Sequence, residues 1–449
     1  MRDRSADGGP AARGADFLLS LHRGQTFDDW TLEDVSVVGY STAGVNVTPA
    51  LYDDGERQYV AFYDVDRALC VASRTLGGEW WTTVLDTKIG ADSHNYPAIA
   101  VDDRGHLHVA ANMHSSELIY YRSAVAGDTG SLRRLDVLID AGVEARVTYP
   151  HFIHDADGAL WFAFRSGGSG AGSEILYRYD SGEAAWTNPA GGPVVDGAGT
   201  MSPYFDANGP ILGPDGKFHL LWVWRDSPDA DTNHTISYAR STDLRTWTDS
   251  WGNDIALPVR PGLGEVVHDV PTGCGLLNNN VRLGFTSSGS GVVVYHRRDS
   301  GGRMQICGAV RGDGGWIVRQ ITDWEYTWEF DGLGSLEFAL EIGRPEAVRG
   351  TLVVEVRRGQ QVDVLTIGDD LDLLRIDRRP VPWPPAARPL YSDGTQVNWD
   401  RGKIGPGVDS ALEDLVLTCS VPVQRDKPLV GDEPHPSPVV VVRARSTVI

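Results

Sequence analysis

Two histidines on either side of a predicted hairpin are the residues of this sequence best suited to chemistry. His94 and His114 lie twenty residues apart, and the residues between them read as a strand, a turn at 102–105 and a second strand. In an antiparallel hairpin, the start of the first strand and the end of the second lie at the same end. Both imidazoles should therefore reach one rim of the molecule, where they can exchange protons near neutral pH.

The same hairpin recurs downstream with other reactive side chains at the matching positions. Tyr149 opens an inner strand, Arg165 closes the strand after it, and Arg225 holds the place of His114 in the following copy. Taken singly, each has a structural explanation, since Tyr before Pro can pack a strand edge and Arg at a strand end can form a salt bridge. Their convergence with His94 and His114 on one rim instead predicts a functional site.

Histidine, tyrosine and arginine together suit β-elimination on a uronic acid. The proton on carbon-5 is weakly acidic because it is alpha to a carboxylate, and a bidentate guanidinium can neutralise that carboxylate. Arg165 is the candidate for this task. A histidine can take the proton, and a histidine or tyrosine can protonate the glycosidic oxygen that leaves carbon-4. This chemistry needs neither a nucleophile nor a pair of carboxylates.

A repeat with a period near fifty residues positions these side chains. Each copy has a strand, a turn, two further strands and usually a closing Trp, and clear copies begin at Thr48-Pro49, Tyr96-Pro97, Tyr149-Pro150 and Ser202-Pro203. Four short strands per repeat, with no helix between them, are typical of β-propeller blades. We therefore predict an all-β fold, a seven-bladed β-propeller with four-stranded blades.

The domain boundaries follow from where the repeat begins and fades. Residues 1–25 are rich in Gly, Ala and Arg and are expected to be a loose leader, and residues 26–449 a single propeller. The last blade would include the proline-rich stretch 380–389 and be closed by an N-terminal strand near 34–40. Because the repeat fades after Gly334, a five-bladed propeller followed by a C-terminal β-sandwich stays open as an alternative.

Composition excludes several classes of partner. A net charge of −21 and a pI of about 4.9 argue against a general nucleic-acid binder, which needs a basic surface. There is no apolar run long enough for a membrane helix and no apolar core of a signal peptide. We expect a soluble monomer, cytoplasmic as written or secreted if a leader was removed. Four cysteines without CxxC spacing predict neither a disulfide framework nor a zinc ribbon.

Several motifs resemble the BNR-4 group of β-propellers over about residues 40–340. They are His-Asn-Tyr-Pro (94–97), Met-His (113–114), Thr-Tyr-Pro (148–150), Phe-Arg-Ser-Gly (164–167), Trp-Arg-Asp (224–226), Asn-His (233–234) and Tyr-His-Arg (295–297). The twenty-residue His–His and sixteen-residue Tyr–Arg spacings are the most specific parts. That group includes seven-bladed polysaccharide lyases that cleave ulvan, and relatives that release rhamnose from rhamnosyl-glucuronate termini.

The resemblance implies a polysaccharide lyase that cleaves an acidic glycan of rhamnose and uronic acid by β-elimination. His94 would be the catalytic base or acid, Tyr149 its partner, and Arg165 the residue that neutralises the carboxylate. Four further residues would bind the substrate: His114, Asn95, Arg225 and Tyr204.

The chemistry itself needs no cofactor, but a structural ion at the rim is an open alternative. Imidazole and thiolate suit zinc, and related ulvan lyases carry a structural zinc. The candidate ligands, which show no compact spacing, are His234, His268, Cys274 and His296. Carboxylates on a neighbouring loop could instead hold calcium, and they are Asp226, Asp229 and Asp231.

Two other functions also stay open. A sialidase-like or other propeller glycoside hydrolase needs two carboxylates about 5–9 Å apart, and Asp64, Asp226 and Asp269 are candidates without a recognisable partner. A non-catalytic glycan-binding BNR propeller could stack sugars on tryptophans such as Trp224, because fold alone does not imply catalysis. The ultraviolet absorbance of an unsaturated uronate product would separate a lyase from both.

Overall fold

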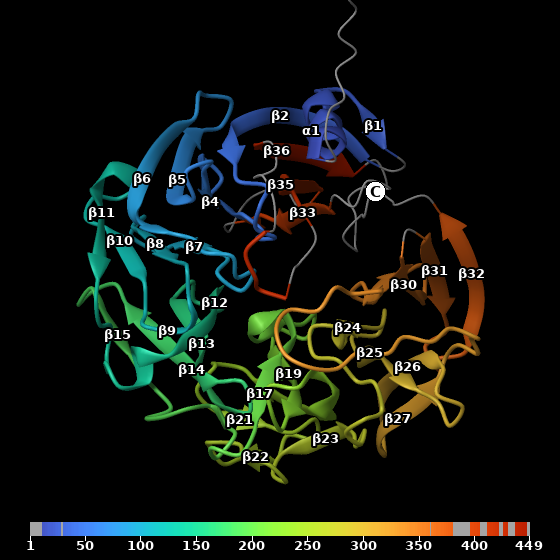
Figure 1. Cartoon of the computed structure of the whole chain (residues 1–449). Helices are drawn as coiled ribbons and strands as arrows, with labels where there is room; N and C mark the ends of the chain where they lie inside the picture. Colours follow the sequence, from blue (N-terminus) through green and yellow to red (C-terminus); the bar gives the residue numbers. More distant parts are fainter. Residues whose placement is uncertain are drawn as a thin grey trace, which may run out of the picture.

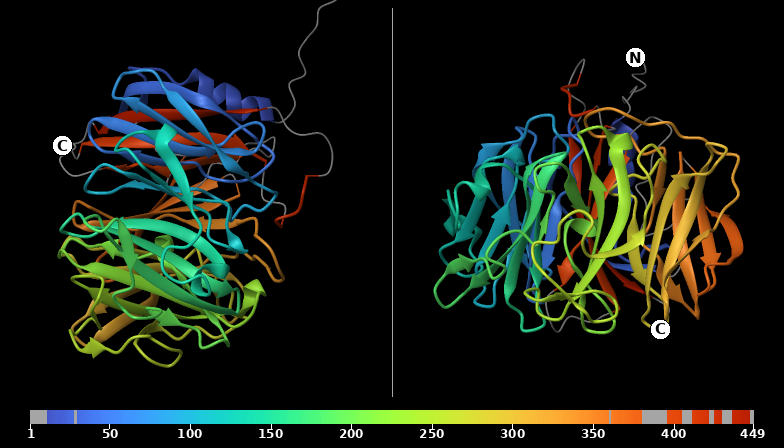
Figure 2. Two further views of the ribbon diagram at one scale, coloured as in Figure 1. Left: turned by 90° about the vertical axis from the view of Figure 1, so that its left-hand side faces the viewer. Right: turned by 90° about the horizontal axis from the view of Figure 1, so that it is seen from below.

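The structure is a ring of β-sheets. The computed structural model describes residues 11–27, 30–359, 361–379, 396–404, 411–421, 425–429 and 436–446. Its strands pair into sheets that stand around a central axis like the blades of a propeller (Figure 1). Seen from the side, neighbouring sheets stand face to face around the axis (Figure 2). The predicted all-β propeller is confirmed.

Six sheets follow one another along the chain. The first contains β3 (Ala50–Asp53), β4 (Arg57–Tyr63), β5 (Ala68–Thr75) and β6 (Trp81–Lys88), with β34 (Lys403–Ile404) beside β3. The second contains β7 (Ala98–Val101), β8 (Leu107–Ala110), β10 (Tyr120–Ser123) and β11 (Leu132–Leu135). The third contains β12 (Val147–His154), β13 (Leu160–Gly168), β14 (Ala171–Asp180) and β15 (Ala185–Thr187), together with β9 (His114–Ser116) and β16 (Val195–Asp196).

The next three sheets continue in the same direction around the ring. The fourth contains β17 (Ser202–Phe205), β18 (Ile211–Leu212), β19 (Phe218–Arg225), β20 (Asn233–Ser241), β21 (Trp247–Thr248), β22 (Asp254–Ile255) and β23 (Glu265–His268). The fifth contains β24 (Arg282–Phe285), β25 (Gly291–Arg298), β26 (Met304–Gly312) and β27 (Gly315–Gln320). The sixth contains β28 (Leu340–Ile342), β29 (Glu346–Val348), β30 (Thr351–Arg358), β31 (Gln361–Ile367) and β32 (Leu373–Arg379).

A further sheet joins the two ends of the chain. It contains β1 (Thr26–Phe27), β2 (Trp30–Ser41), β33 (Gln396–Arg401), β35 (Leu412–Ser420) and β36 (Ser437–Ser446). Strand β2, which includes the predicted closing strand 34–40, pairs antiparallel with β36 over its whole length. The described residues thus form seven hydrogen-bonded sheets, six consecutive in the chain and one built from both ends.

Two details differ from the sequence predictions. Among the described residues only the second and fifth sheets have four strands, because connecting segments add short strands to the others. The sixth sheet stands in the ring (Figure 1), so the described residues after Gly334 do not form a separate sandwich. The stretch 380–389, expected in the last blade, lies outside the described residues.

The expectation of a loose leader is wrong for the part that forms helix α1 (Ala11–Ser20). Leu18 and Leu21 are buried against Leu417 of β35 and Val440 of β36. Leu18 belongs to the helix and Leu21 follows its last residue, and through these two side chains the segment covers part of the closing sheet. In the part of the chain that the structure describes, no helix has the length and apolar character needed to cross a membrane.

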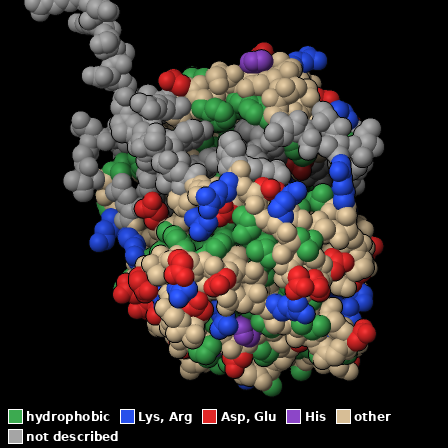
Figure 3. Space-filling view, turned by 90° about the vertical axis from the view of Figure 1, so that its right-hand side faces the viewer, with side chains coloured by type: hydrophobic (Ala, Val, Ile, Leu, Met, Phe, Trp, Pro, Cys, Tyr) green, Lys and Arg blue, Asp and Glu red, His purple; other side chains and the backbone are tan. Residues whose placement is uncertain are grey.

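The hydrophobic core lies between neighbouring sheets. Val71 of β5 packs in one cluster with Val109 of β8, and Trp161 of β13 packs in another with Trp222 of β19. Because most sheets bury both faces in this way, the ends of the strands and the loops are left to form a site. On the face in Figure 3, Asp and Glu side chains lie among scattered Lys and Arg, in keeping with the net charge of −21.

The predicted hairpin that carries the two histidines is present. Strands β7 and β8 are antiparallel with Ala98 opposite Ala110, His94 lies in the loop before β7, and His114 begins β9 after β8. The turn between them ends at Gly105 with φ of 81°, a left-handed conformation that glycine adopts without strain. Both histidines therefore lie at the same end of this hairpin.

Candidate active site

A cavity of about 310 Å³ is the setting for the predicted site residues. Its lining residues come from all seven sheets or from the loops beside them, including Thr48, His94, Tyr149, Asn208, Asn279, Ser335 and Gln396. Of the seven predicted catalytic and substrate-binding residues, three line it: His94, Tyr149 and Arg225. The other four lie around or beneath these.

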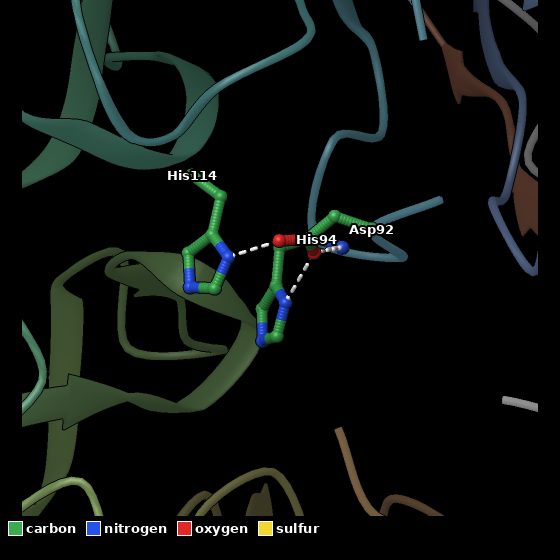
Figure 4. A group of neighbouring side chains, drawn as sticks. All are labelled: Asp92, His94 and His114. Carbon is green, nitrogen blue, oxygen red and sulfur yellow. Dashed lines mark hydrogen bonds and ion pairs between the residues drawn. The ribbon is translucent and has the colours of Figure 1, made fainter. Parts of the chain in front are cut away.

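The two histidines are stacked, with ring centroids 4.0 Å apart and an interplanar angle of 22°. Asp92 holds both of them (Figure 4): one carboxylate oxygen lies 2.8 Å from Nδ1 of His94, and the other contacts Nδ1 of His114. A carboxylate can only accept, so each Nδ1 carries the hydrogen and each Nε2 is left as an acceptor. Both Nε2 atoms lie on the side away from Asp92 (Figure 4).

Sequence reasoning missed Asp92. Burial raises the pKa of this carboxyl, but the hydrogen bonds from His114 and His94 outweigh burial and hold its pKa well below the usual range. Asp92 is therefore ionised at neutral pH. The available signal was the Asp-Ser-His spacing, because a carboxylate two residues before His94 also accepts from the His94 backbone N–H, here at 2.9 Å.

A second carboxylate, Asp426, reaches the same histidine from the C-terminal part of the chain. Its Oδ1 lies 3.8 Å from Nδ1 of His94 and accepts from Oγ of Ser93 at 3.1 Å. Its Oδ2 accepts from the backbone N–H of Ser335 at 2.8 Å. Asp426 thus ties together three segments that are far apart in sequence around His94.

Tyr149 is turned toward the histidines by a bulge in β12. The pairing of β12 with β13 shifts register between Thr148 and His151, and Tyr149 has φ of 60°. A left-handed backbone is rare for an aromatic residue and persists only where the surroundings impose it. The Tyr149 ring centroid lies 5.7 Å from that of His94. Burial, with a smaller effect of Tyr204, raises the pKa of the Tyr149 phenol, which stays protonated at neutral pH.

Arg165 lies beneath the cavity wall rather than on it. Its side chain is 1% exposed, and its guanidinium carbon is 4.9 Å from the Tyr149 ring centroid and 5.3 Å from that of Tyr204. Nη2 donates to Oγ1 of Thr148 at 3.1 Å, whereas Nε and Nη1 have no hydrogen-bond partner among the described residues. Gly172 makes room for the stem, because a Cβ there would lie 2.9 Å from Cδ of Arg165.

The predicted substrate-binding residues divide between the cavity wall and the framework. Arg225 lines the cavity, but its Nε donates to two backbone carbonyls of the following loop, at 3.1 and 3.2 Å. The Tyr204 hydroxyl is hydrogen-bonded to Oγ of Ser169 at 2.6 Å. Asn95 lies beside His94 in sequence, and its carbonyl accepts from a buried tyrosine hydroxyl at 2.6 Å. Some of the hydrogen-bonding groups of Arg225 and Tyr204 are therefore already used in contacts within the protein.

Sequence reasoning also missed an amide-rich part of the cavity wall. Asn278 and Asn279 line it together with Asn208 and Arg282. Asn208 and Asn279 have φ of 60° and 62°, and Nδ2 of Asn208 donates to the Tyr96 hydroxyl at 2.8 Å. Amide side chains both donate and accept, so this wall suits a ligand rich in hydroxyl groups. The Asn-Asn-Asn run at 278–280 was the one local signal for it.

The four predicted zinc ligands do not come together in the described part of the chain. They are His234, His268, Cys274 and His296. His234 has its Nε2 2.9 Å from Oδ1 of Asp226, and His268 has its Nδ1 2.5 Å from the hydroxyl of Tyr295. His296 is fully buried beside aromatic rings. Nor do the three predicted calcium ligands form a group of close donor atoms within the described ranges.

Over the residues described, one group of His, Cys, Asp and Glu side chains offers donor atoms within 4.8 Å of one another. Its members are Asp92, His94 and His114. Such a set is able to hold a divalent cation. In this structure the two Nδ1 atoms and the carboxylate oxygens are already partners of each other (Figure 4). The three side chains therefore form a hydrogen-bonded triad.

These observations define the class of protein. It is a β-propeller whose central cavity is bordered by a histidine pair, a tyrosine and a buried arginine. The chain belongs to the BNR repeat-containing family, whose model matches residues 57–324. The resemblance found in the sequence motifs is confirmed by this match. No curated protein has a sequence that matches this chain.

Solved structures of polysaccharide lyases share the fold. The crystal structure of the polysaccharide lyase Uly1 has a TM-score of 0.61 and 14% identity, covering 95% of this chain and 94% of that one. The structure of a PL25 ulvan lyase bound to –[GlcA(1-4)Rha3S]– has a TM-score of 0.58 and 12% identity, covering 92% of this chain and 95% of that one. At these identities the likeness is one of fold.

Proposed function

We propose that this protein is a polysaccharide lyase that cleaves a uronate-containing acidic glycan by β-elimination. The observation that carries the proposal is the triad of Asp92, His94 and His114 beside a protonated Tyr149 at one cavity. This arrangement offers a proton acceptor and a proton donor within one site, and a buried guanidinium lies against the Tyr149 ring.

His94 is assigned as the base. The hydrogen bond from its Nδ1 to Asp92 selects the tautomer whose Nε2 is free to take the proton from carbon-5 of the uronate. The Asp92 carboxylate then stabilises the imidazolium that forms. The electron pair released at carbon-5 makes the carbon-4–carbon-5 double bond as the bond from carbon-4 to the glycosidic oxygen breaks.

Tyr149 is assigned as the acid. Its raised pKa keeps the phenol protonated until the leaving oxygen needs a proton. The closeness of its ring to that of His94, 5.7 Å between centroids, allows one sugar ring to reach both groups. After release of the two products, a proton passes from His94 to the phenolate through solvent, which restores both groups.

Arg165 is assigned to the uronate carboxylate. Nε and Nη1, which lack partners among the described residues, could donate to the two oxygens of one carboxylate. Because Tyr149 lines the cavity and Arg165 behind it does not, substrate binding must shift the tyrosine ring. Neutralising the carboxylate makes the carbon-5 proton more acidic, and the negative charge that then develops is held by the same cation.

The glycan class is proposed from the family resemblance and from the solved lyase that binds glucuronate–rhamnose units. We propose an acidic glycan that contains rhamnose and uronic acid, of the ulvan or rhamnosyl-glucuronate kind. A structural zinc or calcium ion is compatible with this proposal, and the residues assigned above supply the base, the acid and the positive charge.

Incubation with ulvan and with other uronate glycans tests the proposal. The unsaturated uronate should appear as a rise in ultraviolet absorbance, and the His94→Ala chain serves as the matched control. A hydrolase would release reducing ends without that absorbance, and a binding propeller would retain the glycan unchanged. Either result with the wild-type protein would refute the lyase assignment.

A further inference from the structure

A buried glutamate faces the arginine of the site and has no role in the mechanism above. Strands β13 and β14 are antiparallel, and Glu174 stands directly opposite Arg165. Directly opposed residues of two strands project to the same face of the sheet. The two side chains are 3% and 1% exposed. Because a glutamate is rarely buried this fully without a compensating group, its place beside the cation calls for an explanation.

Three tyrosines of the site lie near this pair. Tyr149 of β12 and Tyr96 from the loop before β7 interact electrostatically with Glu174, and Tyr204 of β17 does so with Arg165. Arg165 is the cation that faces Glu174. Since Nε and Nη1 of Arg165 have no hydrogen-bond partner among the described residues, the glutamate leaves these donors free.

The protonation state of Glu174 decides the net charge of this pocket. Burial raises the pKa of Glu174 to about 8, although the attraction of Arg165 acts in the opposite direction. Below that pH the carboxyl is neutral and the guanidinium is an uncompensated cation. Above that pH the two opposite charges cancel. The attraction between them is several times stronger away from water than at the surface.

We propose that Glu174 is a positioning residue that controls the charge Arg165 offers to an acidic ligand. As the neutral acid it leaves the guanidinium to the substrate's carboxylate, and as the carboxylate it competes with the substrate for the same cation. The proposal rests on the proposed β-elimination, in which Arg165 binds the uronate. It makes Glu174 the origin of an alkaline limit on the reaction.

The kinetic test compares the pH dependence of kcat/KM for three full-length chains on a uronate glycan that the wild type cleaves. The wild type should lose kcat/KM as the pH rises through about 8, the value expected for Glu174. Glu174→Gln should lack this alkaline limb. Glu265→Gln, which changes a buried glutamate of another sheet, should keep it. If Glu174→Gln does not fold, Glu174→Met tests the same loss of charge.

A direct titration separates this inference from the lyase proposal. The carboxyl carbon of isotope-labelled Glu174, assigned by its absence in Glu174→Gln, should titrate near pH 8 by nuclear magnetic resonance. In an Arg165→Gln chain its midpoint should move higher, because the attraction of the cation is gone. An ordinary carboxyl midpoint, or one that ignores Arg165, overturns the inference, as does an alkaline limb that persists in Glu174→Gln. Absence of product in the wild type would reject the lyase proposal, while the titration alone would still decide the coupling.

Discussion

Replacing Asp92 by asparagine should slow elimination roughly a hundredfold without unfolding the chain. The carboxylate makes two side-chain hydrogen bonds to imidazoles and one to the His94 backbone N–H. An asparagine keeps one oxygen acceptor but loses the negative charge. It also points N–H hydrogens at one of the two histidines, which then has to change tautomer or turn away.

The magnitude follows from the hydrogen bond between Asp92 and His94, 2.8 Å long between two side chains that are 23% and 19% exposed. A hydrogen bond to a charged group contributes about 1.5–3 kcal/mol. Because this bond strengthens when the imidazolium forms, most of that energy appears in the transition state. A loss of about 2–3 kcal/mol corresponds to about 30- to 150-fold in kcat.

The assay is the initial rate of unsaturated product across a range of pH. Asp426→Asn is the matched control, since its Oδ1 lies 3.8 Å from the same Nδ1 and makes no hydrogen bond to it. We expect that control to lose less than about tenfold, equivalent to about 1.4 kcal/mol. A kcat for Asp92→Asn close to that of the wild type would refute the assignment of Asp92 and His94 as the base.

Three further predictions test the same site and its surroundings. His94→Ala should abolish elimination, because His94 lines the cavity and is the assigned base. His114→Ala should raise KM more than it lowers kcat, because His114 is expected to bind the substrate beside the stacked His94 ring; the opposite behaviour in steady-state kinetics would exchange their roles. Arg165→Lys should lose nearly as much activity as Arg165→Ala, about 2–4 kcal/mol of transition-state stabilisation, because a point charge cannot replace a planar fork. Near-full turnover of the lysine variant would exclude Arg165. Between pH about 4.3 and about 8 the wild type should become less stable as the pH rises, because the folded chain keeps the proton of Glu174 that the unfolded chain releases. Urea unfolding should show a flatter dependence for Glu174→Gln, and an equally steep one would contradict the raised pKa.

Much of the fold could be predicted from the sequence because its signals are local. Strand, turn and strand recur every fifty residues or so, and the strand–turn–strand pattern between His94 and His114 is enough to bring both to one end of the hairpin that β7 and β8 form. Helix α1 was missed for the opposite reason. A helix of ten residues has little stability of its own, and Leu18 is buried only because the closing sheet lies beneath it.

The candidate site was predicted in the same uneven way. The types and spacing of His94, Tyr149 and Arg165 pointed to proton transfer beside a carboxylate. They could not show how deeply each side chain is buried, and the structure places Arg165 behind the rings of Tyr149 and Tyr204. The predicted zinc ligands shared a chemistry and a stretch of sequence, but in the described residues their side chains turn to separate partners.

The sequence by itself determined the periodic elements and the kinds of reactive group at their ends, because turn chemistry and alternation act between near neighbours in the chain. Tertiary structure alone decided which groups meet. Asp426 reaches Ser93 and His94 from more than three hundred residues away, and Glu174 is set opposite Arg165 by strand register. Hydrogen bonding and burial act through space, so the partners that tune each reactive side chain exist only once the ring has closed.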